Sequence, residues 1–93
     1  MSRISQFLKN PPGTSGKVMG WVRSVRKQKA HCFIDLDDGS RNIQVLASAE
    51  KVSSIITGSS VEVSGTLVEG PKELEIHSQE IKILGESDGV KAI

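Results

Sequence analysis

GWVRSVRKQKAHCFIDLDDGSRNIQVL, residues 20–46, is the stretch that decides the fold. It holds three runs with the composition of β-strands, separated by two turn signals, together with a dense group of lysines and arginines. The segments on either side supply shorter elements of the kind that close a sheet into a barrel. Residues 20–46 therefore predict the centre of a β-sheet that the flanking segments complete.

The second and third runs alternate in polarity, as strands with one buried face do. In residues 32–36 the apolar positions face the core, which turns Phe33 outward. The same count in residues 42–46 turns Gln44 outward. Between the runs, an Asp-Gly dipeptide ending at Gly39 is a strong hairpin signal, because glycine adopts positive φ at no steric cost. We expect this hairpin to place Phe33 and Gln44 on one exposed face.

An exposed aromatic ring beside an exposed amide, with arginines upstream, can stack one nucleic-acid base and hydrogen-bond its edge. The pattern also permits a different interpretation, in which the alternation is shifted by one position and Phe33 is a core residue. Trp21 is either a second stacking platform or barrel packing, and we favour packing. Cys32 is expected to be a small core residue, since its neighbour His31 would point to the opposite face of the strand.

Three aspartates cluster in the same stretch without making a paired-carboxylate site. Asp38 is interpreted as turn chemistry, Asp37 as a solvated neighbour, and Asp35 as a residue that orients a nearby arginine. The sequence contains no glycine-rich phosphate loop and no zinc-ligand spacing. These residues therefore indicate binding rather than catalysis.

Composition bounds the class of protein. With 93 residues, 37% hydrophobic and 25% charged, the chain fits one small soluble domain. No apolar run approaches the ~20 residues of a membrane-spanning helix, and residues 1–10 lack the apolar stretch of a secretory signal. A single cysteine excludes an internal disulfide and favours a reducing compartment. No membrane partner is expected.

The charge is polarised along the chain although the net charge is only +1. Residues 17–46 carry six positive and three negative side chains, a balance of +3, whereas residues 69–88 carry two and six, a balance of −4. The basic half could meet phosphates while the acidic half limits indiscriminate binding to polyanions. The alternative is that both are simply solvated faces.

The remaining elements follow in order. Residues 2–9 have the apolar spacing of a short amphipathic helix, which a Pro-Pro-Gly run ends. Residues 17–26 predict a long first strand in which Gly20 permits a bend or bulge, so the direction of Arg26 stays open. The polar turn 27–30 leads into the second strand.

The second half of the chain predicts one helix and two strands. Ser48 can cap a short helix that Gly58 stops. Residues 61–68 alternate cleanly as a fourth strand, and 69–72 form a turn. Residues 73–84 form the last strand, whose shift of parity predicts a bulge near residues 78–79.

Five strands with a short helix between the third and the fourth is the order of the OB-fold, an all-β barrel. That fold binds oligonucleotides across strands two and three and the loops that join strands one to two and four to five. The face of Phe33 and Gln44 and the turns 27–30 and 69–72 all fall there.

Several of these runs, with their spacings, resemble the N-terminal anticodon-binding domain of the asparaginyl, aspartyl and lysyl class II tRNA synthetases. The runs are Gly20-Trp21-Val22-Arg23-Ser24-Val25-Arg26, Phe33-Ile34-Asp35-Leu36, Asp38-Gly39-Ser40 and Ile43-Gln44-Val45. The resemblance divides the chain into an N-terminal helix and linker (1–15), the OB domain (16–86) and a tail or linker to a catalytic domain (87–93). The asparaginyl enzyme is the nearest match and the aspartyl enzyme the second.

The resemblance implies roles for individual residues. Phe33 is expected to stack on the central anticodon uridine, Gln44 to hydrogen-bond its edge, and Arg26 to contact the anticodon nucleotides. Arg23 and Lys29 complete the expected RNA-binding set. No catalytic or metal-binding residue is expected.

The resemblance also implies partners and surroundings. A tRNA anticodon stem-loop and the catalytic domain of the parent synthetase are the expected partners. No cofactor is expected for this domain, while the full enzyme, an asparagine-tRNA ligase, would use ATP and Mg²⁺. The full enzyme is expected to be a homodimer and the isolated domain a monomer, in the cytoplasm or, alternatively, the mitochondrion.

Two other functions keep the same fold. A general single-strand binder would be expected to show several exposed aromatic side chains, yet aromatic residues make up 3% of this chain. An OB domain that binds only protein would leave the grouping of Arg26, Phe33 and Gln44 without a purpose.

Overall fold

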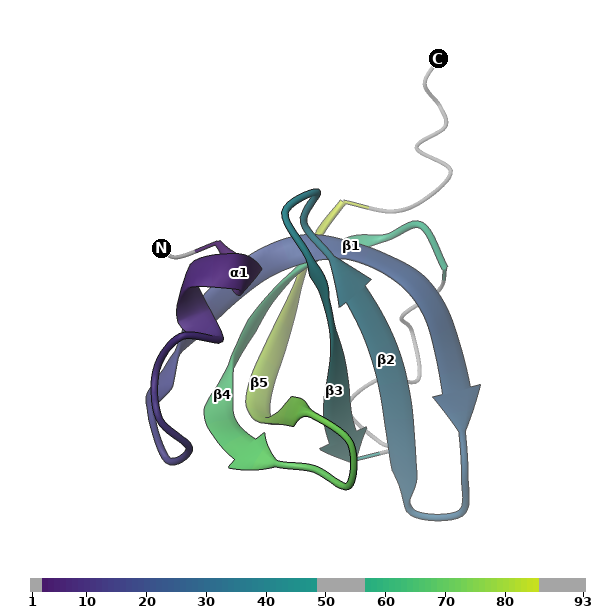
Figure 1. The fold of residues 1–93 in the computed structure, drawn as a ribbon. Coiled ribbons are helices and arrows are strands. Elements are labelled where there is room, and N and C mark those ends of the chain that lie inside the picture. Colours follow the sequence, from purple (N-terminus) through teal and green to yellow (C-terminus); the bar gives the residue numbers. More distant parts are fainter. Residues whose placement is uncertain (1–2, 49–56, 86–93) are drawn as a thin grey trace.

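A computed structural model describes residues 3–48 and 57–85 as a closed five-stranded β-barrel with one short helix (Figure 1). The elements, in chain order, are α1 (Ile4–Phe7), β1 (Ser15–Lys27), β2 (His31–Asp37), β3 (Asn42–Ser48), β4 (Ser60–Glu69) and β5 (Leu74–Gly85). Around the barrel the strands follow the order β1-β2-β3-β5-β4. The predicted all-β, five-stranded OB barrel is confirmed. The predicted helix between β3 and β4 and the predicted tail lie outside the described residues.

Alternating apolar side chains fill the barrel, as the sequence predicts. Cys32 is fully buried, as are the alternate residues Ile34 and Leu36 of β2, which confirms Cys32 as a core residue. Phe33 faces outward on the other side of β2. The buried core consists of Ile4, Phe7, Val18, Val22, Cys32, Ile34, Leu36, Ile43, Val45, Ala47, Val61, Val63, Leu67 and Ile76. Two of these come from α1, so the short helix is held by burial of its apolar side against the barrel.

β1 is long enough to pair with two different strands, and a bulge divides its two halves. Its first half pairs with β4 and its second half with β2. The bulge lies at Arg23, which has no partner in the register with β2, and not at Gly20 as the sequence suggested. At Gly20, β1 instead passes so close to β2 that a Cβ atom would lie 2.5 Å from the carbonyl oxygen of Asp37.

The bulge settles the direction of Arg26. Inserting one residue reverses the alternation, so Val25 packs against the core after the bulge and Arg26 points outward. Arg26 pairs with Phe33 on β2, on the same outer face of the sheet. A second bulge, at Gln79 in β5, confirms the shift of parity predicted near residues 78–79.

The turn between β2 and β3 is organised by Asp38. Gly39 has φ +90°, as the Asp-Gly signal predicts. The Asp38 carboxylate accepts hydrogen bonds from the Ser40 backbone and hydroxyl and, through its other oxygen, from the backbone N–H of Ile4 at 2.7 Å. One side chain therefore fixes the turn and anchors the start of α1 to it.

Two expectations about the neighbouring aspartates are wrong. Asp37 is not merely solvated, because it pairs with Arg23 at 3.2 Å and accepts the backbone N–H of Gly39 at 2.7 Å. Asp35 accepts a hydrogen bond from the side-chain amide of Asn42 at 2.9 Å, instead of orienting an arginine. The sequence could not reveal these pairings, since the bulge and the hairpin register decide which side chains meet.

The expectation that Trp21 packs within the barrel is also wrong. Its side chain points outward on β1 and stays 45% exposed. The ring lies near the β2–β3 turn, 3.8 Å from where a Cβ atom on Gly39 would be. No other tryptophan exists in the chain.

Hydrogen bonding also sets the acidity of Asp38. Burial alone would raise the pKa of this carboxyl, but hydrogen bonds from the Ser40 hydroxyl and from the backbone N–H groups of Ile4, Ser40 and Arg41 outweigh it and lower the pKa below its ordinary value. A folded-state pKa below the unfolded value makes the charged form stabilising. That contribution is complete above the ordinary aspartate pKa of about 3.9 and is lost as the pH falls through the lower folded-state pKa.

We expect Asp38→Ala to lower the free energy of unfolding by about 2 kcal/mol at pH 7, because it removes an acceptor shared by the turn and by α1. Urea unfolding followed by circular dichroism measures this. Asp38→Asn keeps an uncharged acceptor, so it should lose less stability and should flatten the decline of stability below about pH 4. Equal stabilities for Asp38→Ala and the unaltered chain would show that Asp38 does not anchor α1.

Candidate nucleic-acid interface

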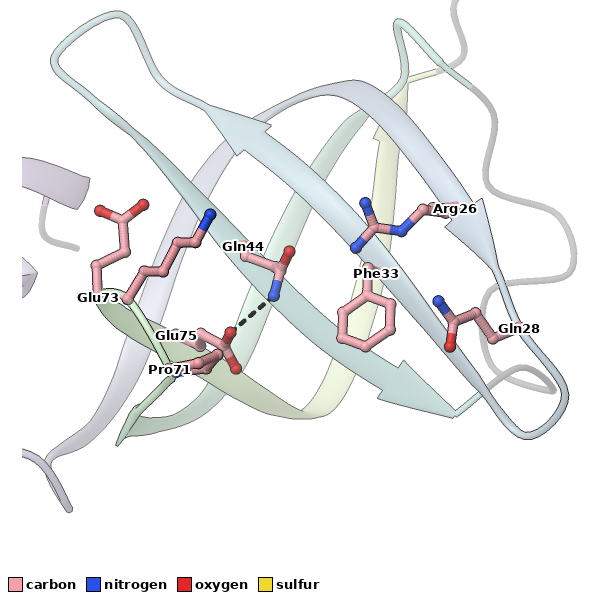
Figure 2. Close-up of a pocket in the computed structure, with 8 residues that line it drawn as sticks. Arg26, Gln28, Phe33, Gln44, Pro71, Glu73 and Glu75 are labelled. Carbon is pink, nitrogen blue, oxygen red and sulfur yellow. Dashed lines mark hydrogen bonds between the residues drawn. The ribbon is translucent and has the colours of Figure 1, made fainter.

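An open hollow of about 580 Å³ lies on the outer face of the barrel, between the β1–β2 loop and the β4–β5 loop (Figure 2). Its lining residues come from β1, β2, β3 and β5 and from both loops. They are Arg26, Gln28, Phe33, Gln44, Pro71, Lys72, Glu73 and Glu75. This "outer hollow" is where the sequence predicted an oligonucleotide-binding face. Three residues of the predicted set, Arg26, Phe33 and Gln44, meet in it.

Arg26 lies over the ring of Phe33. The guanidinium carbon is 5.0 Å from the ring centroid, within the range of a cation–π contact. The contact follows from the register, since Arg26 and Phe33 are partners across β1 and β2. Phe33 is half-buried while Arg26 is exposed, so the ring rests against the sheet and the guanidinium lies on its solvent side.

Gln44 is held by a carboxylate from another strand. Its Nε2 donates a 2.7 Å hydrogen bond to Oε2 of Glu75 on β5 (Figure 2). A carboxylate only accepts hydrogen bonds, so this contact fixes which end of the amide faces Glu75. The amide oxygen of Gln44 is thereby turned away from Glu75 and keeps its capacity to accept.

A smaller hollow of about 270 Å³ continues along the same face toward the β2–β3 turn. It shares Arg26, Phe33 and Gln44 with the first hollow and adds the hydrogen-bonded pair of Asp35 and Asn42. The outer face of β2 and β3 therefore offers a continuous polar track on both sides of the aromatic ring.

The charges around the outer hollow are mixed. Arg26 and Lys72 bring positive charge, and Glu73 and Glu75 bring negative charge. Arg41 at the edge of the track is 3.4 Å from Glu73. Carboxylates repel phosphates but accept N–H groups from bases, so this hollow suits the base side of a strand better than its backbone.

Two residues of the predicted set lie outside the hollow. Arg23 sits on the bulge and is paired with Asp37, and Lys29 is exposed in the β1–β2 loop. Neither lines the outer hollow, and both stay predictions as RNA contacts. Glu73 and Glu75 were missed as site residues, because the sequence interpretation placed them in an acidic half that only limits binding. Predicting the parallel pairing of β3 with β5 could have placed Glu75 beside Gln44.

Within residues 3–48 and 57–85, no group of three or more His, Cys, Asp or Glu side chains is placed to hold a metal ion. In those residues no helix is long and apolar enough to cross a membrane.

Comparisons with known proteins also indicate a nucleic-acid-binding domain. Residues 17–84 match a family described as an OB-fold nucleic acid binding domain of the tRNA anticodon type. The human protein named asparaginyl-tRNA synthetase is 39% identical over 85 residues, which cover 85% of this chain and 18% of the relative. The Arabidopsis thaliana asparagine-tRNA ligase of chloroplasts and mitochondria is 38% identical over 88 residues, covering 82% of this chain and 16% of the relative.

Solved structures agree on the fold. The asparaginyl-tRNA synthetase of Pyrococcus horikoshii, crystallised with asparaginyl-adenylate, superposes with a TM-score of 0.81 at 18% sequence identity, covering 94% of this chain and 23% of that one. The chain thus spans about a fifth of the length of these relatives, and the match covers their N-terminal domain. With a family match over most of its length and a barrel of the matching topology, the chain belongs to the tRNA anticodon family of OB-fold nucleic acid binding domains.

Proposed function

We propose that this chain binds the anticodon loop of a tRNA as the anticodon-binding domain of an asparaginyl-tRNA synthetase. The observation that carries the proposal is the assembly in one hollow of a ring that can stack, an arginine above it and an amide oriented by a carboxylate. The human and Arabidopsis relatives are named as asparaginyl enzymes, which supports asparagine as the amino acid that the parent enzyme attaches to tRNA. The aspartyl enzyme remains the alternative.

Each of the three residues has its own task in this proposal. Phe33 supplies a π-face on which the central anticodon base stacks. The amide oxygen of Gln44 accepts the N3–H of uridine, whereas cytidine presents an unprotonated N3 that the same oxygen repels. Glu75 holds the amide in the orientation that makes this distinction. Arg26 can turn from the ring to a neighbouring phosphate.

Catalysis belongs to the rest of the proposed enzyme. Formation of an aminoacyl-tRNA would require a catalytic domain that binds ATP and Mg²⁺, and this chain would contribute the recognition of the tRNA. A homodimeric full enzyme and a monomeric isolated domain are part of the same proposal. The compartment stays a prediction of cytoplasm or mitochondrion, since the relatives include an organellar enzyme.

Phe33→Ala should weaken binding of an anticodon hairpin by about 1–3 kcal/mol, with little change in preference among bases, because stacking is tolerant of sequence. Fluorescence anisotropy with a labelled RNA hairpin measures this. The matched control is Trp21→Ala, which removes an exposed aromatic side chain outside the hollow and should leave affinity unchanged. A larger loss from Trp21→Ala than from Phe33→Ala would show that the base stacks on Trp21 and not on Phe33.

Gln44→Leu should remove the preference for a central uridine over a central cytidine, a difference of about 1–2 kcal/mol, because leucine keeps the size but not the hydrogen bond. Binding of the cytidine hairpin should stay the same or rise slightly, because leucine also removes the repulsion between the amide oxygen and cytidine N3. Glu75→Gln should reduce the same preference partly, since the Gln44 amide is then free to turn. Gln28→Leu, which removes the other amide of the hollow, is the control; a uridine preference that survives Gln44→Leu would exclude Gln44 as the reader.

Lys29→Ala should weaken all hairpins alike and reduce the slope of log affinity against log salt by about 0.7, the contribution of one phosphate contact on a single strand. Arg23→Ala should change the slope less, because Asp37 already neutralises part of that charge. Titrations of the same hairpins at several salt concentrations measure both slopes. Affinity that is independent of salt would contradict binding to RNA.

A further inference from the structure

A histidine lies close to the outer hollow without lining it. His77 stands two positions after Glu75 on β5, and its imidazole is 45% exposed. In the register of the barrel it lies between Leu46 of β3 and Thr66 of β4. The chain contains two histidines, and the other, His31, begins β2. No task in the proposed recognition falls to His77, although histidine is the residue that ordinarily changes charge between pH 5 and 8.

The carboxylate of Glu75 lies between the amide of Gln44 and the imidazole of His77. Its Oε2 accepts the 2.7 Å hydrogen bond from Nε2 of Gln44 (Figure 2), and its Oε1 lies 3.9 Å from Nε2 of His77. The Glu75 side chain is only 13% exposed, so the carboxylate is partly enclosed by the sheet. Because one rigid planar group joins the two oxygens, a contact that fixes Oε1 also limits the movement of Oε2.

The charged groups that face His77 are carboxylates of its own strand. Its register partners, Leu46 and Thr66, carry no charge, and the outer-face residues two positions along on β3 and β4 are also uncharged. Along the outer face of β5, Glu75 precedes His77 and Glu80 follows it beyond the bulge. In the part of the chain that the structure describes, the carboxylate placed for an ion pair with His77 is that of Glu75. A charge on His77 therefore acts first on Glu75.

We propose that His77 is a positioning residue for the Gln44 amide and acts through Glu75, an inference that rests on the proposed function. At 3.9 Å a neutral imidazole makes no hydrogen bond with Oε1. A protonated imidazole is attracted to the carboxylate at that distance and can close to a charge-assisted contact. Glu75 is then held through both oxygens, and the Gln44 amide is kept with its oxygen toward the base. The preference for a central uridine is therefore higher when His77 is charged.

Two effects of a charge on His77 have to be separated. A positive charge near RNA raises the affinity for every hairpin, because it attracts phosphates. A fixed amide instead changes the ratio between hairpins that differ only in the central base. The ratio of the affinities for central uridine and central cytidine therefore measures positioning and cancels the general attraction.

Fluorescence anisotropy at pH 8 and at pH 6 gives this ratio for the unaltered chain and for two variants. In the unaltered chain the ratio should rise by about two- to threefold at pH 6, within the range that an exposed ion pair supplies. His77→Gln is neutral at both pH values and should give the low ratio throughout. His77→Arg is charged at both and should give the high ratio throughout. A ratio in the unaltered chain that is equal at the two pH values, or lower at pH 6, would overturn the proposal.

Two carboxylate variants test whether the effect passes through Glu75. Glu75→Gln should abolish the pH dependence of the ratio, because the imidazolium then lacks its partner. Glu80→Gln removes the other carboxylate on the same face of β5 and should leave the pH dependence as it is. A pH dependence that survives either Glu75→Gln or His77→Gln would belong to another group or to the RNA itself, and it would contradict the proposal.

A measurement without RNA separates this proposal from the proposed function. In NMR spectra of the free chain, the side-chain Nε2–H signals of Gln44 report its contact with Glu75. They should shift between pH 8 and pH 6 in the unaltered chain and in Glu80→Gln, and they should stay in place in His77→Gln. Signals that stay in place in the unaltered chain, or that move equally in His77→Gln, would refute positioning by His77. Failure of the unaltered chain to bind either hairpin at both pH values would refute the proposed function instead.

Discussion

The barrel closes where β3 pairs in parallel with β5, through Val45 with Ile76 and Leu46 with His77. Because parallel strands run in the same direction, the two residues that precede a paired couple also lie side by side. Gln44 precedes Val45 and Glu75 precedes Ile76, and these two side chains meet at 2.7 Å on the outer face. The contact that closes the core thus also sets the orientation of the Gln44 amide in the outer hollow.

The bulge at Arg23 has a comparable effect on the other side of the hollow. A regular β1 would have kept one alternation throughout, with Arg26 on the side of Val18 and Val22. The extra residue lets β1 bury Val22 before the bulge and pack Val25 inward after it, while Arg26 reaches Phe33. Local irregularity and core packing therefore act together, and the site depends on backbone register as much as on the identity of its side chains.

Particular residues show how far the sequence could predict this structure. Alternation placed Phe33 and Gln44 correctly on one face, and the parity shift located the bulge at Gln79. Alternation could not place the bulge at Arg23, because both parities of β1 are partly apolar. It also could not predict the exposure of Trp21 or the pairing of Glu75 with Gln44. Those features depend on contacts between strands far apart in the sequence, which periodicity within one strand does not report.

In the free domain the guanidinium of Arg26 occupies one face of the Phe33 ring. With its guanidinium 5.0 Å from the centroid, the ring already has a partner before any ligand arrives. An exposed cation–π contact is worth about 0.5–1 kcal/mol. A ligand that stacks on the same face must therefore gain more free energy from the ring than the guanidinium loses. Stray apolar molecules gain little from the exchange. A nucleotide bound in the proposed way would gain more, because its phosphate could bind the arginine that its base displaces.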